Sequence, residues 1–254
     1  MKPIITFNNI RKKYGKVTAL DGISFNIYEN DRIGFIGNNG CGKTTTINIM
    51  CNILNYNSGD AYAFGKRITT NYVSYKSRLG IVLSEPYYID DFSVEQYWKF
   101  VCRHHKVPAD EITTRIEDLI RFLKLTGDRK KRIHQLSSGN KSKVSIGGAL
   151  LHNPELLILD EPFVNVDMET VEQVKELLKR YIDSKTLFIT SHDLNLVIDL
   201  CTKFIIMEKG RVLNMIRLSD FENQDDLKNF IKTSIIKNNH DPEISWLKKS
   251  VRNT

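Results

Sequence analysis

A glycine-rich segment in the first fifth of the chain constrains its fold more than any other feature. Residues 37–44 read Gly-Asn-Asn-Gly-Cys-Gly-Lys-Thr and complete the pattern G-x-x-x-x-G-K-[ST]. An apolar run at residues 32–36 precedes the pattern, and a helix-like segment at residues 45–50 follows it. Strand, glycine loop and helix in this order predict an α/β nucleotide-binding core, because inward-facing loop N–H groups and a helix N-terminus together bind a polyphosphate.

Three residues of this loop carry specific expectations. Lys43 is expected to reach the β- and γ-phosphates, and Thr44 is expected to ligate Mg²⁺. Cys41 lies among N–H donors beside Lys43, so we hypothesise that its thiolate is favoured and that its alkylation blocks nucleotide binding. The alternative is a tight strand-to-helix turn that binds nothing, which the flanking elements disfavour.

Composition fits one compact domain with room for an insertion. The chain has 254 residues, of which 41% are hydrophobic and 26% are charged, and its formal net charge is +7. The charge is diffuse, so it indicates either a solvated basic surface or an anionic partner. The densest basic run, residues 129–132, has the same two interpretations, with lipid headgroups or RNA as the partner.

Cysteine usage and hydropathy add two exclusions. The four cysteines are scattered without a C-x-x-C pair, so neither a disulfide framework nor a zinc site is suggested, as in a reducing cytoplasm. No stretch approaches the roughly 20 apolar residues of a membrane-spanning helix. We therefore expect any membrane role to depend on a partner.

Hydrophobic periodicity divides the chain into three parts. Strand-like runs up to the glycine loop, at residues 4–7, 17–25 and 32–36, predict an N-terminal β layer. Residues 93–125 carry apolar side chains at three-to-four spacing and predict a helical insertion. Strand-like runs then alternate with helix-like segments, which predicts a parallel sheet. The strands are expected at 156–159, 186–190 and 203–207, and the helices at 143–151, 168–184 and 194–200.

Two carboxylates directly follow the apolar run at residues 156–159. A run without polar alternation is typical of a strand buried on both faces, and ligands bind at the carboxyl ends of such strands. Asp160 is expected to bind Mg²⁺, directly or through water, and Glu161 to orient and polarise the water that attacks the γ-phosphate. Because Pro162 comes next, a turn or helix-start signal is the alternative.

Residues 136–140, Leu-Ser-Ser-Gly-Asn, complete a resemblance to the ATP-binding subunit of ABC transporters, whose signature there is Leu-Ser-Gly-Gly-Gln. Ser138 and Asn140 depart from that signature. The resemblance implies that Ser137, Gly139 and the following helix face the γ-phosphate of an ATP held by the opposing subunit. Without the family, the same residues are an ordinary helix N-cap.

Other positions match the family in the same order along the chain. Tyr14 lies where an aromatic side chain stacks on adenine, and His192 resembles the histidine that hydrogen-bonds the γ-phosphate. Asp167 matches the end of the loop that crosses the dimer interface, although Val164 replaces the usual serine. The resemblance thus implies catalytic roles for Lys43, Glu161 and His192, and nucleotide contacts from Tyr14, Val17, Asn38, Asn39, Gly40, Cys41, Gly42, Lys43, Thr44, Thr45, Ser137 and Gly139.

The expected loop between the sheet and the helical insertion, residues 80–87, departs most from the family. By spacing, Ser84 occupies the place of a glutamine that ligates Mg²⁺ and senses the γ-phosphate, and Glu85 is the neighbour of comparable reach. The implied metal ligands are therefore Thr44 and Asp160 with Ser84 or Glu85. A carboxylate at this position resembles the export subfamily of bacitracin-resistance and bacteriocin-immunity ATPases.

The resemblance implies an α/β fold, namely the P-loop NTPase core of an ABC ATPase with an N-terminal antiparallel β layer and a helical insertion subdomain. The ATPase domain is expected at residues 1–217, the helical subdomain at about 86–150, and a tail without an assigned role at 218–254. ATP and Mg²⁺ are the implied cofactors.

The implied partners are a second ATPase subunit and a multi-span membrane permease. The chain is expected at the cytoplasmic face of the membrane, powering export of peptides, antibiotics or other amphipathic compounds, with no specific nucleic acid partner. A groove near Tyr87, Tyr88 and Trp98 is expected to accept a short permease helix, with core packing as the alternative for Trp98. Two other functions remain open: a non-transport ABC ATPase of an assembly complex, and a regulatory module of low turnover.

Overall fold

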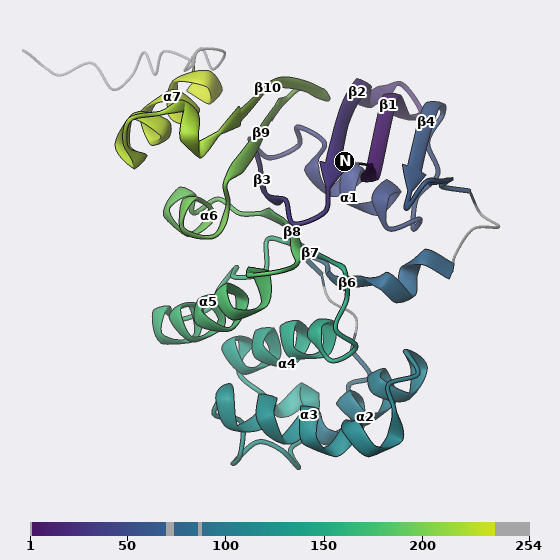
Figure 1. The fold of residues 1–254 in the computed structure, drawn as a ribbon, viewed down its shortest axis with the longest axis vertical. Helices are drawn as coiled ribbons and strands as arrows, with labels where there is room; N and C mark the ends of the chain where they lie inside the picture. Colours follow the sequence, from purple (N-terminus) through teal and green to yellow (C-terminus); the bar gives the residue numbers. More distant parts are fainter. Residues whose placement is uncertain (1, 70–73, 86–87, 237–254) are drawn as a thin grey trace, which may run out of the picture.

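The computed structural model describes residues 2–69, 74–85 and 88–236. Figure 1 shows an N-terminal sheet at one end of the molecule, the helices of residues 94–150 at the other end, and a second sheet between them. Among the described residues, none of the helices has the length and apolar character that crossing a bilayer requires.

The N-terminal sheet is antiparallel, with the strand order β2-β1-β4-β5. A hairpin joins its two long strands through Gly15, whose φ of 55° lies in the left-handed region that costs glycine little. The side chains of Ile5, Phe7 and Ile10 in the first strand are fully buried in the core. The strands are β1 (Pro3–Tyr14), β2 (Val17–Tyr28), β4 (Ser58–Ala63) and β5 (Lys66–Arg67).

The second sheet is built from β3 (Arg32–Gly37), β6 (Leu79–Val82), β7 (Leu156–Asp160), β8 (Thr186–Thr190), β9 (Lys203–Glu208) and β10 (Arg211–Arg217). Its order is β10-β9-β3-β8-β7-β6, and only the end strand β10 is antiparallel to its neighbour. Every residue of β7 and β8 is buried, as expected of strands covered on both faces. The carboxyl ends of β3, β6, β7 and β8 therefore meet at one edge of the sheet.

Helices cover this sheet and build the far end of the molecule. They are α1 (Lys43–Met50), α2 (Val94–His104), α3 (Ala109–Phe122), α4 (Ser138–Leu150), α5 (Met168–Ile182), α6 (Leu194–Leu200) and α7 (Gln224–Ile236), with 3-10 turns η1 (Ser74–Arg78), η2 (Ile133–Gln135) and η3 (Leu218–Asp220). Two helices begin at side-chain caps: Ser93 forms a capping box with Gln96, and Asp167 accepts the N–H of Thr170.

The antiparallel layer, the parallel sheet and the helical insertion are confirmed. One expectation about the connection is wrong: Gly80, Ile81 and Val82 belong to a strand, because they pair with β7. Core packing is the correct interpretation of Trp98, which is fully buried and donates its indole N–H to Val144 O at 2.9 Å. Tyr87 lies outside the described residues. Of the segment after residue 217, α7 buries Leu227 and Ile231 in the core.

The basic run at residues 129–132 is largely neutralised. Arg129 forms ion pairs with Glu95 and Glu117, each at 2.6 Å. Hydrogen bonds from Arg129 first and Lys99 second lower the pKa of Glu95 to about 2. Lys131 and Arg132 also make ion pairs, with Asp128 and Asp91. The run therefore supports the fold of the helical end rather than forming a free cationic patch.

Two stacked imidazoles join the helical end to the second sheet. His105, at the end of α2, stacks on His152, with ring centroids 3.7 Å apart. The His152 Nε2–H group donates to Leu79 O of β6 at 2.9 Å. Burial, followed by the charges of His152 and His104, lowers the pKa of His105 from 6.5 to about 4. The contact therefore requires neutral rings.

We expect acidification to loosen this contact. His105 becomes protonated near pH 6.5 in the unfolded chain but only near pH 4 in the folded chain. The free energy of unfolding is therefore highest above pH 6.5 and decreases as the pH falls from 6.5 to 4, by on the order of 2 kcal/mol. Denaturant unfolding across this range measures the loss. His105→Gln should flatten the pH dependence and the exposed His134→Gln should not; equal slopes for all three proteins would contradict the assignment.

Candidate functional site

The glycine loop between β3 and α1 closes around the side chain of Lys43. Gly42 has a φ of 112°, and a Cβ there would lie 2.7 Å from Ala19 O, so both backbone conformation and packing require glycine. Lys43 is only 7% exposed and donates hydrogen bonds to Gly37 O at 2.8 Å and Asn38 O at 3.3 Å. The loop therefore holds a cation at the N-terminus of α1, an arrangement suited to anions.

The remaining predicted loop residues surround this cation. Asn39, Gly40 and Thr44 are exposed, and Asn38 and Thr45 are half-buried. Gly40 has a φ of 74°, and a Cβ on it would meet open space. The open side of the loop is thus the side from which a phosphate can approach.

The two predicted carboxylates are held at the end of β7 by one hydroxyl from β8. Asp160 is fully buried, and its Oδ1 accepts a hydrogen bond of 2.7 Å from the Thr190 hydroxyl. The same hydroxyl oxygen accepts the backbone N–H of Glu161 at 2.9 Å. Glu161 itself has a φ of 49°, in the left-handed region. Neighbouring strands thus fix the Asp160 carboxylate and the Glu161 backbone at one edge of the sheet.

His192 contacts Glu161 directly. Its backbone N–H donates to Glu161 Oε2 at 3.2 Å, and its Nε2 lies 3.3 Å from Glu161 Oε1. Because β8 pairs with β7 in parallel, the segments that follow these two strands lie side by side. Glu161, which is predicted to polarise the attacking water, and the predicted histidine are therefore brought together.

The aromatic candidate sits at the tip of the first hairpin. Tyr14 pairs with Val17 across the turn, and the two residues are 49% and 67% exposed. The ammonium of Lys12 lies 5.1 Å from the centroid of the Tyr14 ring. The hairpin leads directly to Ala19, which contacts Gly42 of the loop. Tyr14 and Val17 thus offer an exposed apolar surface on a strand that also borders the loop.

The signature-like segment packs against the loop at residues 164–167. Ser137 caps α4 by accepting the N–H of Asn140 at 3.3 Å. A Cβ on Gly139 would lie 2.7 Å from Asp167 Oδ2, and the N–H of Thr170 is the first of the hydrogen bonds that lower the pKa of Asp167. Gly139 therefore lies against Asp167, and Ser137 precedes Gly139 by two residues in the same helix start.

The two departures from the signature have local partners. The Ser138 hydroxyl donates to Asn165 O at 2.8 Å, and the Asn140 amide donates to Asp128 Oδ2 at 2.6 Å. Serine in place of glycine thus adds a hydrogen bond between the signature and the next loop, which a glycine cannot make.

Ser84 and Glu85 follow β6 and are exposed. Val82 pairs with Leu159, one residue before Asp160, so both candidates leave the sheet at the same edge as the carboxylates. Pro86 and Tyr87 lie outside the described residues.

The expectation for Cys41 is wrong in its chemistry. Cys41 is only 4% exposed, and burial raises the pKa of its thiol more than nearby Lys43 lowers it. Its side chain fills space beside Gly37, where an added Cβ would lie 2.6 Å from the sulfur. The residue therefore packs the loop as a neutral thiol.

The residues present fit Mg²⁺ and a polyphosphate. Asp160 Oδ2 is buried and accepts no hydrogen bond in the described part of the chain, whereas Glu161 Oε1 has only His192 Nε2 at 3.3 Å. Such an oxygen is costly to leave unsatisfied, and a hard cation with its coordinated water satisfies carboxylate oxygens well. Thr44, at the first turn of α1, adds a hydroxyl, and Lys43 supplies the charge for phosphate.

Thr190 is the functional residue that sequence reasoning missed. It ends a predicted strand and precedes His192, but only the pairing of β8 with β7 shows that its hydroxyl reaches Asp160. The available signal was a threonine at the carboxyl end of a buried apolar run.

The chain is similar in sequence and in fold to ATP-binding proteins of ABC transporters. Residues 20–164 match a family model described as ABC transporter. An uncharacterized ABC transporter ATP-binding protein of Methanocaldococcus jannaschii is 31% identical over 221 residues, covering 87% of this chain and 80% of that protein. The linearmycin resistance ATP-binding protein of Bacillus subtilis is 32% identical over 206 residues, covering 81% of this chain and 66% of its own length. Other matching relatives include a Nod factor export ATP-binding protein of Ralstonia nicotianae and a spermidine/putrescine import ATP-binding protein of Clostridium novyi.

A solved ATP-binding subunit of an ABC transporter has the same fold. It superposes with a TM-score of 0.82 and 22% identity, covering 90% of this chain and 99% of the other. The P-loop architecture with its antiparallel layer and helical end is thereby confirmed.

We expect Thr190→Val to slow nucleotide turnover about tenfold, because it removes the hydrogen bond to Asp160 and leaves that carboxylate unsupported. The KM for ATP should change little, since Thr190 touches the carboxylates rather than the loop. Steady-state kinetics measures both quantities. Thr186→Val, at the other end of β8, is the matched control; a similar loss in both variants would indicate a general effect on the strand.

Proposed function

This chain belongs to the ABC transporter family, and we propose that it is the ATP-hydrolysing subunit that powers a separate membrane permease. It is an ABC-type ATPase. The observation that carries the site assignment is the cluster of Asp160, Glu161 and His192 at one edge of the sheet, in which Thr190 bonds Asp160 and the Glu161 backbone, and Glu161 bonds His192. That edge is also where β3 delivers the glycine loop.

The proposed chemistry is in-line attack of water on the γ-phosphate. Lys43 and the loop amides hold the phosphates, and Tyr14 with Val17 supports the adenine. Thr44, Asp160 and either Ser84 or Glu85 would hold Mg²⁺, which would neutralise phosphate charge. Glu161 orients and polarises the attacking water, and His192 holds that water and the γ-phosphate through its contact with Glu161.

We further propose that two subunits share each nucleotide. Gly139, two residues after Ser137, packs against Asp167, and Val164 and Met168, on either side of Asp167 in the chain, are exposed apolar side chains. A second subunit packed here would remove these two apolar side chains from water. ATP then joins the loop of one subunit to the signature of the other, and hydrolysis releases the closed dimer.

The permease is proposed to contact a groove at the helical end. A cavity of about 340 Å³ lies between β6, α2 and α4, with Leu83, Tyr97 and Val101 among its lining residues. It lies next to the carboxyl end of β6, so movement at Ser84 and Glu85 can reach a helix seated there. This contact would hold the chain at the cytoplasmic face of the membrane.

Export of an amphipathic compound is the transport direction we propose. The support is similarity to a linearmycin resistance ATP-binding protein and a carboxylate, Glu85, beside the position of the usual glutamine. The same features favour the bacitracin-resistance and bacteriocin-immunity type. An assembly ATPase without a permease is the second candidate.

Affinity purification of the chain from native membranes tests the permease assignment. A stoichiometric multi-span protein is expected to accompany it, and its substrate profile in resealed vesicles gives the direction of transport. Recovery with soluble partners alone would support the assembly ATPase instead.

Lys43→Ala is expected to abolish ATP binding, because the buried ammonium is the main positive charge inside the loop. Calorimetric titration with ATP measures the loss. The exposed Lys66→Ala in the antiparallel sheet is the matched control, and undiminished binding by Lys43→Ala would refute the loop assignment.

Glu161→Gln is expected to retain ATP but to lower turnover by at least about a hundredfold, because an amide cannot polarise the attacking water. The ATP-bound dimer should therefore accumulate, and size-exclusion chromatography with ATP measures it. Hydrolysis at the wild-type rate would show that Glu161 is not the base.

A further inference from the structure

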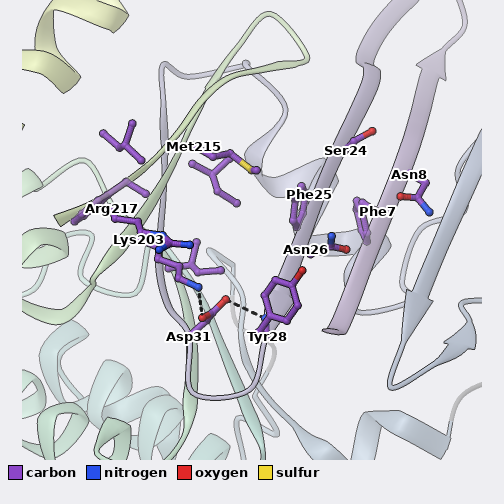
Figure 2. A pocket seen from close by; sticks show the side chains of 14 residues that line it. Phe7, Asn8, Ser24, Phe25, Asn26, Tyr28, Asp31, Lys203, Met215 and Arg217 are labelled. Carbon is purple, nitrogen blue, oxygen red and sulfur yellow. Dashed lines mark hydrogen bonds and ion pairs between the residues drawn. The ribbon is translucent and has the colours of Figure 1, made fainter. Parts of the chain in front are cut away.

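The free edges of the two sheets face each other across one seam. β2 is the end strand of the antiparallel sheet, and β10 is the end strand of the second sheet. At the narrow end of this seam, Asp21 N–H donates to Gly210 O at 2.8 Å, and Arg211 pairs with the Asp21 carboxylate at 2.5 Å. Beyond this contact, the C-terminal halves of both strands line a cavity of about 390 Å³ (Figure 2).

The cavity lies at the strand edges. Consecutive residues of a strand point to opposite faces, yet Met215 and Ile216 of β10 both line the cavity, as do Phe25 and Asn26 of β2. A second cavity, at the narrow end, shares Ser24 and Met215 with the first. The seam is therefore one continuous groove between two edges, and in Figure 2 Met215 faces Phe25 across it.

Of the two edges, that of β10 is better prepared to receive another strand. In the described part of the chain, β10 pairs only with β9 and β2 only with β1. The ladder of β2 with β1 shifts register at four places, whereas the ladder of β10 with β9 shifts once, between Val212 and Asn214, and then keeps an unbroken register to Arg217. Bulges discourage strand addition, and a regular edge permits it.

The seam has an apolar floor and a positive rim. Phe7, Phe25 and Phe204 are almost fully buried beneath it. The charged residues that line the two cavities are four cations and two carboxylates, namely Arg11, Lys203, Arg211, Arg217, Asp21 and Asp31.

Arg217 is the cation that remains for a ligand. Asp31 accepts hydrogen bonds from Lys203 at 2.5 Å and from Tyr28 N–H at 2.9 Å (Figure 2), and Asp21 is bonded by Arg11 and Arg211. Arg217 is exposed; its backbone N–H donates to Asp220 Oδ2 at 2.7 Å, and its guanidinium makes no ion pair within the described residues. Charge complementarity therefore favours a carboxylate at the open end of the seam.

We propose that the seam binds an extended acidic segment of another protein as an added strand on β10. The segment places an apolar side chain on the phenylalanine floor and a carboxylate against Arg217, while its backbone pairs with β10. The chain's own residues 237–254 carry four Lys or Arg against two acidic residues, so their charge does not suit the seam. Ile33, at the start of β3, lines the cavity, so this site lies at the opposite end of that strand from the glycine loop.

A fluorescein-labelled synthetic peptide of alternating valine and glutamate is the probe. Fluorescence anisotropy with the full chain should show saturable binding, and methylation of alternate backbone nitrogens in the peptide should weaken it at least about tenfold. Arg217→Glu should weaken binding by a similar factor, while Arg180→Glu, an exposed arginine on α5, should not. Hydrogen exchange should show new amide protection in residues 212–217.

Three results would overturn the proposal: no saturable binding, equal binding of the methylated peptide, or protection confined to other strands. A Lys43→Ala protein should bind the peptide as the wild type does. Failure at the seam is therefore distinguishable from failure of the ATPase assignment.

Discussion

The hydrogen bond from the Thr190 hydroxyl to the buried carboxylate of Asp160 is the interaction on which the candidate site depends. A carboxylate with no exposed surface is costly unless its oxygens are satisfied. Thr190 satisfies one oxygen and, through the same hydroxyl, fixes the N–H of Glu161. The second oxygen of Asp160 remains available, and this is the feature that a cation beside a phosphate would use.

The second half of the site is organised around a different contact. Ser138 and Gly139 join the start of α4 to the loop before α5, through a hydroxyl bond to Asn165 and a close approach to Asp167. This unit is built from α4 and α5, whereas Lys43 belongs to the glycine loop after β3. The resemblance to ABC ATPases is the reason why we assign the two units to different nucleotides. The hydrogen bond to Asn165 gives Ser138 a structural role that the usual glycine cannot fill.

The sequence predicted the sheet and much of the site because those features are local. The glycine pattern, the buried run before Asp160 and the capping serine are each written in a few adjacent residues. Thr190 was missed because its role arises only when β8 pairs with β7. The chemistry of Cys41 was misjudged because neighbouring donors are visible in a sequence, whereas burial by β3 and β9 is not. The His105–His152 stack likewise joins residues 47 positions apart.

The central claim is that the glycine loop and the signature segment of one chain serve two different nucleotides. Mixing two inactive variants tests it most directly: Lys43→Ala damages the loop, and Ser137→Asp keeps the helix cap while placing a negative charge toward the γ-phosphate. Each variant alone should be inactive, and an equal mixture should regain about a quarter of the wild-type ATPase rate, since half the dimers carry one intact site. A mixture no more active than its components, or an active Ser137→Asp protein, would contradict the account.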